Sequence, residues 1–176
     1  MRTLPLSKVY QLLEPGPVTL LVTADEGRAN VMAMSWHMMM EFEPPGIACI
    51  VSPAGYSHEA LEKTGECVIA VPAATMAERV VGIGNCSGRT IDKFERFHLH
   101  HRKAQIVAPP LLVECIANIE CRVVDRRMVR DYGMYILEAV KAWHDPAQAR
   151  APMFHHRGWG EFAMDGDIVR IPSNMR

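Results

Sequence analysis

The segment Cys86–Phe94, with the sequence Cys-Ser-Gly-Arg-Thr-Ile-Asp-Lys-Phe, carries residue types that bind a phosphate group. The glycine-rich loop Gly82–Arg89 runs into Thr90–Phe97, whose pattern predicts a short amphipathic helix. Free N–H groups and the helix dipole favour an anion at such a junction. Hydroxyl and cationic donors are interspersed through it, at Ser87, Arg89, Thr90 and Lys93. The segment therefore predicts a phosphate site, against the alternative of a capped surface helix with solvated charges.

A second segment, Asn30–Met40, has the composition of a wall for a flat ligand. Its period-two alternation predicts a strand with soft side chains on one face, at Met32, Met34 and Trp36, and small residues on the other. Methionine and tryptophan give polarizable contact area, and small residues let backbone groups approach the polar edge of a ring. The alternative is plain barrel core in which methionine fills gaps.

Other motifs in the chain do not assemble a known site. Gly82-x-Gly84 resembles part of a dinucleotide fingerprint, but the third glycine is misplaced and no Walker A sequence occurs. Gly-x-Ser-x-Gly is missing, so no serine nucleophile is predicted. The histidines of His98–His101 and His155–His156 lack companion ligands at zinc spacing and read as exposed loop residues. The sequence therefore predicts no catalytic side chain and no metal site.

Length and composition fit one domain, residues 1–176, with a buried core, because 49% of the residues are apolar. The formal net charge of −1 provides no basic face, so nucleic acid is not an expected partner. Five cysteines without a Cys-x-x-Cys pair fit reduced thiols in the cytoplasm. No run reaches membrane-spanning length and Met1–Leu13 lacks a signal-peptide core, so no membrane partner is expected.

The apolar runs predict mainly strands with a few short helices between them. Strands are expected at 17–24, 30–37, 47–52, 66–71, 112–124 and 134–143, with a last strand near the end of 162–171. Helices are expected at 58–63, 75–81 and 90–97. Because regular helices do not separate the strands, parallel βαβ units are disfavoured. An antiparallel β-barrel with short inserted helices is the predicted fold.

Several motifs, taken in order, resemble the flavin reductase-like family of FMN-binding split barrels, and its flavoredoxin-type branch in particular. They include Asn30-x-Met32-x-x-Ser35-Trp36, Pro44-Pro45, Ser57–Leu61, Thr64–Val68, Ser87-Gly88-Arg89-x-x-Asp92-Lys93-Phe94 and Ile119–Cys121. The resemblance runs from Pro17 to about Val140. It implies a Greek-key split barrel and a homodimer with FMN near the subunit interface.

The resemblance also implies that the two segments hold one FMN molecule. The isoalloxazine would lie against Asn30, Met32, Ala33, Met34, Ser35 and Trp36. The ribityl phosphate end would be held by Ser52, Ser57, Ser87, Gly88, Arg89, Asp92 and Lys93, with Phe94 completing the motif.

Three functions are compatible with this family. The first is an FMN-dependent reductase that oxidises NADH or NADPH and passes electrons to a small-molecule or protein acceptor. The second is an FMN electron carrier without a direct nicotinamide step. The third is a non-redox split barrel that holds a ligand such as haem. In the first, the tail His155–Gly160 is expected to lie near the open flavin face.

Overall fold

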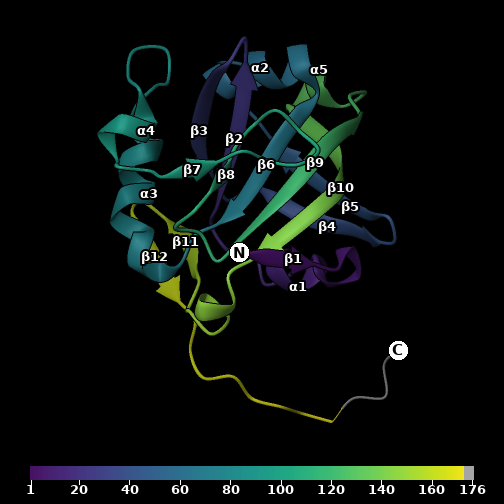
Figure 1. Ribbon diagram of the computed structural model, residues 1–176, viewed down its shortest axis with the longest axis vertical. Helices are drawn as coiled ribbons and strands as arrows, with labels where there is room; N and C mark the ends of the chain where they lie inside the picture. The colour runs from purple at the N-terminus through teal and green to yellow at the C-terminus, as the bar shows by residue number, and fades with distance from the viewer. Residues whose placement is uncertain (173–176) are drawn as a thin grey trace.

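The computed structural model describes residues 1–172, and one eight-stranded sheet dominates it (Figure 1). The strands are β1 (Arg2–Leu4), β2 (Thr19–Asp25), β3 (Arg28–Met34), β4 (His37–Phe42), β5 (Pro45–Ile50), β6 (Glu66–Val71), β9 (Ala117–Asp125) and β10 (Met134–His144). Their order is β3-β2-β6-β9-β10-β5-β4, with β1 beside β10, and every pairing is antiparallel. Smaller ladders join β7 (His101–Arg102) to β8 (Leu111–Leu112) and β11 (Phe154–Gly158) to β12 (Glu161–Met164).

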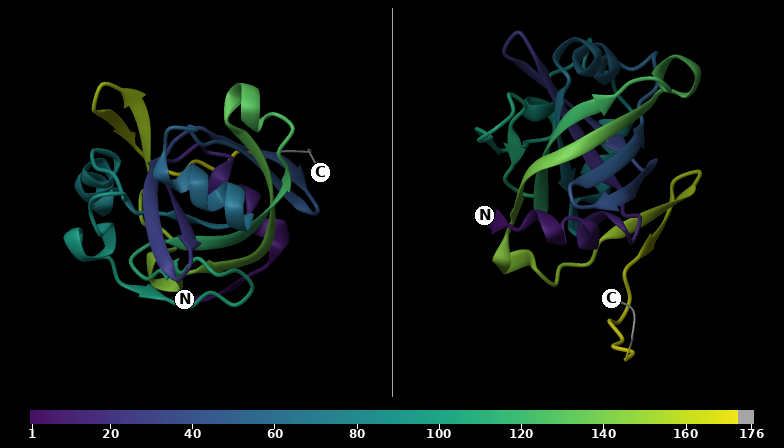
Figure 2. Two further views of the ribbon diagram at one scale, coloured as in Figure 1. Left: turned by 90° about the horizontal axis from the view of Figure 1, so that it is seen from above. Right: turned by 90° about the vertical axis from the view of Figure 1, so that its right-hand side faces the viewer.

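The large sheet curls into a barrel, as chain connectivity requires. β3 and β4 stand at opposite ends of the strand order, yet only Ser35 and Trp36 separate them in the chain. The three Cα–Cα steps from Met34 to His37 span about 11 Å at most, so the two ends of the sheet must come together. Seen from above, the strands form a ring with α2 (Tyr56–Thr64) across it (Figure 2). The predicted antiparallel barrel is confirmed.

The central strands are buried on both faces, which explains their nearly continuous apolar sequences. In β2, Leu21 packs in the cluster inside the barrel, whereas Leu20 and Val22 pack in a second cluster outside it. β6 alternates in the same way, with Ile69 inside and Val68 outside. The outer cluster lies beneath α3 and the β11–β12 hairpin, which therefore cover one side of the barrel.

The remaining helices are short. They are α1 (Tyr10–Leu13), α3 (Ala77–Gly84), α4 (Lys93–Arg96) and α5 (Val129–Tyr132), with 3-10 turns at Leu6–Lys8, Ala74–Met76 and Pro146–Gln148. α2 ends at Gly65, whose φ of +67° is the left-handed conformation that glycine adopts without strain. Through residue 172, no helix has both the length and the apolar character needed to span a membrane.

One buried carboxylate organises the irregular segment between β7 and β8. Glu120 of β9 is fully buried, with four N–H groups donating to its two oxygens. The donors are the backbone N–H groups of Gln105, Ile106 and Val107 and the indole of Trp143. Three of the four donors belong to the segment between β7 and β8. Because all three bond to one side chain, Glu120 fixes the course of this segment over the barrel.

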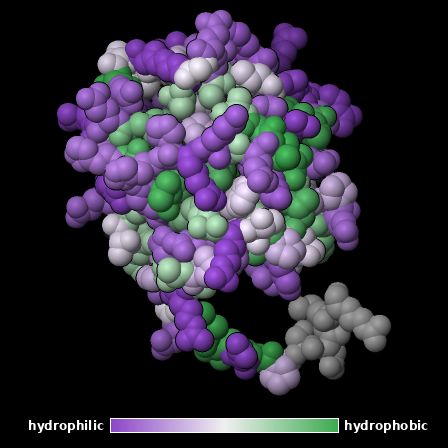
Figure 3. Space-filling view, in the orientation of Figure 1, coloured by the Kyte–Doolittle hydropathy of each residue, from purple (hydrophilic) through white to green (hydrophobic). Residues whose placement is uncertain are grey.

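Most of the predicted strands are confirmed, including 66–71 and 134–143, and Cys49 and Cys67 are buried in β5 and β6. The prediction of one strand over 112–124 was wrong, because the chain turns between β8 and β9. The final strand is also not found: β12 ends at Met164, and after Asp165 the chain leaves the body of the molecule (Figure 3). Asn118 explains the first break, because its side chain bonds both backbone groups of Leu112.

Candidate functional site

A polar cavity of about 300 Å³ lies where β3, the beginning of α2, the end of α3 and the following loop meet. It is lined by Asn30, Met32, Ala33, Ala54, Gly55, Tyr56, Ser57, Ile83, Gly84, Cys86, Ser87, Gly88 and Lys93. Residues from both predicted segments therefore share one cavity. Whether the two segments share one ligand, as the resemblance implies, stays a prediction.

Close packing of three elements fixes the shape of the cavity. Asn30, buried in β3, donates from Nδ2 to Oγ of Ser57 in the first turn of α2, at 2.8 Å. A Cβ added to Gly88 would lie 2.0 Å from Asn30 Oδ1 and 2.9 Å from Cδ1 of Tyr56. Only glycine fits at this position, so the absence of a side chain lets the loop close against β3 and α2.

Lys93 brings a buried positive charge to the cavity. The residue is 5% exposed, and its Nζ donates to the carbonyl oxygen of Ile83 at 2.9 Å. None of the carboxylates in the described part of the chain forms an ion pair with it. Burial lowers the pKa of the Lys93 ammonium, because desolvation disfavours the charged form. An ammonium has three donors, so a lysine with one internal bond beside Ser57 and Ser87 is suited to an anion.

Arg89 lies at the mouth of the cavity rather than in its lining. Its guanidinium is held by the carboxylate of Glu59 on α2, with Nη1 to Oε2 at 3.0 Å and a second contact from Nη2 to Oε1. The hydrogen bond between them lowers the pKa of Glu59 and raises the pKa of Arg89. The same guanidinium stands 5.5 Å from the ring centre of Tyr56, a lining residue.

A second arginine, on β3, binds the loop between α3 and α4 that carries Gly88. Arg28, at the start of β3, donates from Nη2 to the carbonyl oxygen of Gly88 at 2.7 Å. Its guanidinium lies 5.4 Å from the Tyr56 ring centre, within the range of a cation–π contact. The mouth of the cavity therefore carries two guanidinium groups beside one aromatic ring.

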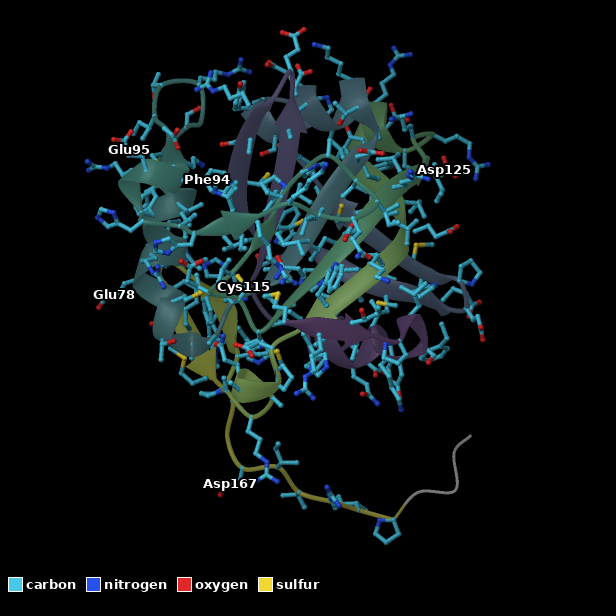
Figure 4. All side chains as sticks on the ribbon, viewed as in Figure 1. Glu78, Phe94, Glu95, Cys115, Asp125 and Asp167 are labelled. Carbon is cyan, nitrogen blue, oxygen red and sulfur yellow. The ribbon has the colours of Figure 1, made fainter. Side chains whose placement is uncertain are left out.

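The predicted helix start over 90–97 is wrong. α4 begins only at Lys93, and Asp92 accepts hydrogen bonds from the backbone N–H groups of Phe94 and Glu95. Two of the first N–H groups of the helix, those of Phe94 and Glu95, are therefore occupied by its own N-cap and do not offer an anion site. Figure 4 shows Phe94 and Glu95 on α4, and Phe94 packs against the outer core. Donors for an anion in the cavity are therefore Lys93, the hydroxyl groups and the backbone N–H groups at the start of α2, which has no side-chain cap.

A second cavity, also about 300 Å³, continues from the first. Ala33 and Gly84 line both, so the two spaces meet between β3 and α3. Its other walls are Val18, Met34, Ser35, Val80, Val81 and Asn85, with His156, Gly160 and Phe162 from the β11–β12 hairpin. The two cavities together form a path with a cationic end and a largely apolar end.

The predicted site residues fall into three groups. The polar cavity contains Asn30, Met32, Ala33, Ser57, Ser87, Gly88 and Lys93, and the second cavity adds Met34 and Ser35. Trp36, Ser52, Arg89, Asp92 and Phe94 do not line either cavity. Trp36 is 71% exposed beyond the end of β3, and Ser52 is exposed in the turn after β5.

Sequence reasoning missed several lining residues. Tyr56 had no signal beyond its place before Ser57. Gly84 lies in the Gly82-x-Gly84 fragment, and it packs against β3: an added Cβ would stand in ordinary contact, 3.6 Å, with that of Ala33. In the tail, His156 borders the second cavity, whereas Trp159 is fully exposed at the hairpin turn.

His155 fastens the hairpin to the barrel. Its Nδ1 is 3.0 Å from the carbonyl oxygen of Gly16, and its Nε2 is 2.8 Å from Oδ1 of Asp165. Both partners are acceptors, so the doubly protonated imidazolium satisfies both contacts. The hydrogen bond to Asp165 raises the pKa of His155, and His155 lowers the pKa of Asp165.

We expect this contact to stabilise the protein between the lowered pKa of Asp165 and the raised pKa of His155. A raised histidine pKa gives stabilisation that is complete below the unfolded value, about 6.5, and is lost as pH rises through the folded value. A lowered aspartate pKa gives stabilisation that is lost as pH falls through the folded value. The difference in melting temperature between the wild type and His155→Gln should therefore shrink towards alkaline pH. A difference that is constant with pH, or that Asp165→Asn does not reproduce, would contradict this.

Comparison with known proteins agrees with this geometry. Residues 12–161 match the model of the flavin reductase like domain. The uncharacterized protein YddH of Escherichia coli (strain K12) is 30% identical over 173 residues, covering 90% of this chain and 92% of that protein.

Two solved structures share the fold. One is an FMN-binding domain of a flavin reductases-like enzyme from Shewanella baltica OS155, with a TM-score of 0.89 and 23% identity over 97% of this chain and 96% of that one. The other is the flavoredoxin of Desulfovibrio vulgaris (Miyazaki F), with a TM-score of 0.80 and 22% identity over 90% of this chain and 91% of that one. The family model, the relative and the shared split-barrel fold lead to one conclusion: the chain belongs to the flavin reductase-like family.

Proposed function

We propose that this protein is an FMN-binding flavoprotein, and the buried cation of Lys93 carries the proposal. FMN ends in a phosphate dianion, which would supply the counter-charge that Lys93 does not find among the described residues. The hydroxyl groups of Ser57 and Ser87 line the same cavity and can donate to phosphate oxygens. The adjoining apolar cavity, walled by Met34, Val80 and Phe162, suits a flat ring system.

The activity we propose is reduction of the flavin by NADH or NADPH, with electrons passed on to a small-molecule or protein acceptor. When bound, the flavin supplies the hydride and electron chemistry. The chain would bind and orient it: Lys93 and the serines at the phosphate, and the end of β3 along the ring. Hydride transfer from a nicotinamide to a flavin needs no general base from the protein, so the proposed activity requires no catalytic side chain.

An electron carrier is the second candidate. The fold similarity to a flavoredoxin favours it, and the β11–β12 hairpin over the second cavity would restrict access by a large nucleotide. A non-redox barrel that holds a different ligand, such as haem, is the third. Haem carries carboxylates rather than a phosphate, so a preference for phosphate would separate the third candidate from the other two.

Anaerobic mixing of the FMN-loaded protein with NADH and with NADPH separates the first two candidates. Fast loss of the flavin absorbance at about 450 nm with either nucleotide supports a reductase. If neither nucleotide bleaches a flavin that dithionite reduces fully, the protein is an electron carrier reduced by another protein.

We further propose that two copies assemble through β4. This strand is one end of the sheet order, and it exposes Met38, Met40 and Phe42 at 57%, 51% and 59%, beside Trp36 at 71%. Apolar patches of this kind mark interfaces, and two-fold dimers are the commonest closed assembly.

Light scattering at micromolar concentration should accordingly give twice the chain mass of 19.7 kDa. Met38→Glu should shift the mass towards the monomer, because it places a charge in the contact. A wild-type mass of 19.7 kDa would contradict the dimer.

The cytoplasm is the compartment we propose for this chemistry. All five cysteines are free, and Cys49, Cys67, Cys115 and Cys121 are buried. Free thiols persist in a reducing compartment, which supports this location.

A further inference from the structure

Arg89 is the cation at the cavity mouth, and it is already paired. Its backbone N–H donates to Oγ of Ser87 at 3.2 Å, which places the residue directly beside two lining positions, Ser87 and Gly88. Its side chain is turned to the Glu59 carboxylate on α2, and both side chains are about half exposed, at 47% and 53%.

The pairing matters because a carboxylate and a phosphate use the same donors. The guanidinium fork binds either group through two parallel N–H···O contacts. A phosphate held by Lys93 would lie in the cavity that Ser87 and Gly88 line, next to Arg89. Glu59 occupies the edge of the fork formed by Nη1 and Nη2, so a phosphate must displace Glu59 before it can bind this edge in the same bidentate way.

We propose that Glu59 competes with the FMN phosphate for Arg89 and thereby sets how tightly FMN is held. This inference rests on the proposed FMN site and assigns an affinity-determining role to a residue outside the cavity lining. Lys93 provides the fixed charge, and Arg89 provides a second charge that the carboxylate withholds. The protein then holds FMN more loosely than Lys93 and Arg89 together would allow. Loose binding suits exchange of the flavin between proteins.

The decisive experiment compares dissociation constants for FMN and riboflavin in the wild type, Glu59→Gln, Arg89→Gln and the double variant. Exposed ion pairs are weak, so Glu59→Gln should tighten FMN binding by roughly two- to fivefold. Riboflavin, which lacks the phosphate, should bind all four proteins alike. Glu62→Gln is the matched control, because Glu62 lies three residues further along the exposed side of α2 and pairs with Arg126.

The double variant separates competition from simple charge repulsion. If Glu59 acts by holding Arg89, Glu59→Gln should have no effect on FMN affinity once Arg89 is Gln. An equal gain in both backgrounds would mean that Glu59 repels the phosphate through space, which overturns the competition. An unchanged ratio of FMN to riboflavin affinity in Glu59→Gln would overturn it as well. Failure of the wild type to bind FMN would instead overturn the proposed function, and this inference with it.

Discussion

Lys93→Met is expected to weaken FMN binding by roughly 10- to 100-fold, because a charge-assisted hydrogen bond contributes about 1.5–3 kcal/mol. Methionine has nearly the same length and suits a site that is 5% exposed, so the fold should survive the change. Riboflavin affinity should remain within about twofold, since the lost ammonium faces the phosphate and not the ring. The dissociation constants can be measured by quenching of flavin fluorescence.

Lys103→Met is the control for this prediction. Lys103 is exposed on the segment after β7, and it does not line either cavity. This variant should bind FMN as the wild type does. Equal losses of FMN and riboflavin affinity in Lys93→Met would show that the lysine supports the cavity as a whole rather than the phosphate, and would remove the observation on which the proposed function rests.

Glu120→Leu is expected to lower the free energy of unfolding by about 3–5 kcal/mol, because it removes the one buried acceptor of four N–H donors, three of them part-buried and that of Val107 buried. For a chain of this length, the melting temperature should fall by roughly 6–20 °C. Glu120→Gln should cost less, because its amide oxygen still accepts while its NH₂ group faces other donors. Urea unfolding followed by circular dichroism measures both variants.

Glu78→Gln provides the comparison, because Glu78 projects from the outer side of α3 (Figure 4) and is exposed. Its effect should stay within about 0.5 kcal/mol. If Glu120→Leu were as mild as this control, the segment between β7 and β8 would be held by its apolar contacts, such as Val107, and not by the carboxylate.

The barrel was predictable because its signal is local and repeated. In β2 and β6 nearly every residue is apolar, and successive residues pack on opposite faces, which identifies buried strands. Because no long helices separate the strands, antiparallel pairing between them is the expected arrangement. The helix over 90–97 was mispredicted because Asp92 has two readings in sequence: a polar residue within a helix, or an N-cap. Its carboxylate bonds to two backbone N–H groups, and this selects the cap.

Long-range contacts explain which parts of the site could not be predicted. Residue type and local pattern pointed to Ser87 and Lys93, and the family resemblance pointed to Ser57; all three line the cavity. The Glu59–Arg89 pair joins residues 30 positions apart through side chains alone, so no spacing in the sequence signals it. The same holds for the hairpin, whose place over the second cavity depends on Val18 N–H donating to the Phe154 carbonyl at 2.8 Å.

The most direct test of the account is a calorimetric titration of the wild-type protein, freed of any bound flavin, with FMN and in parallel with riboflavin. We predict one FMN per chain, bound at least about tenfold more tightly than riboflavin, because the phosphate gains the buried charge of Lys93. Equal affinity for the two flavins, or no binding of either, would contradict the claim that this cavity is an FMN phosphate site.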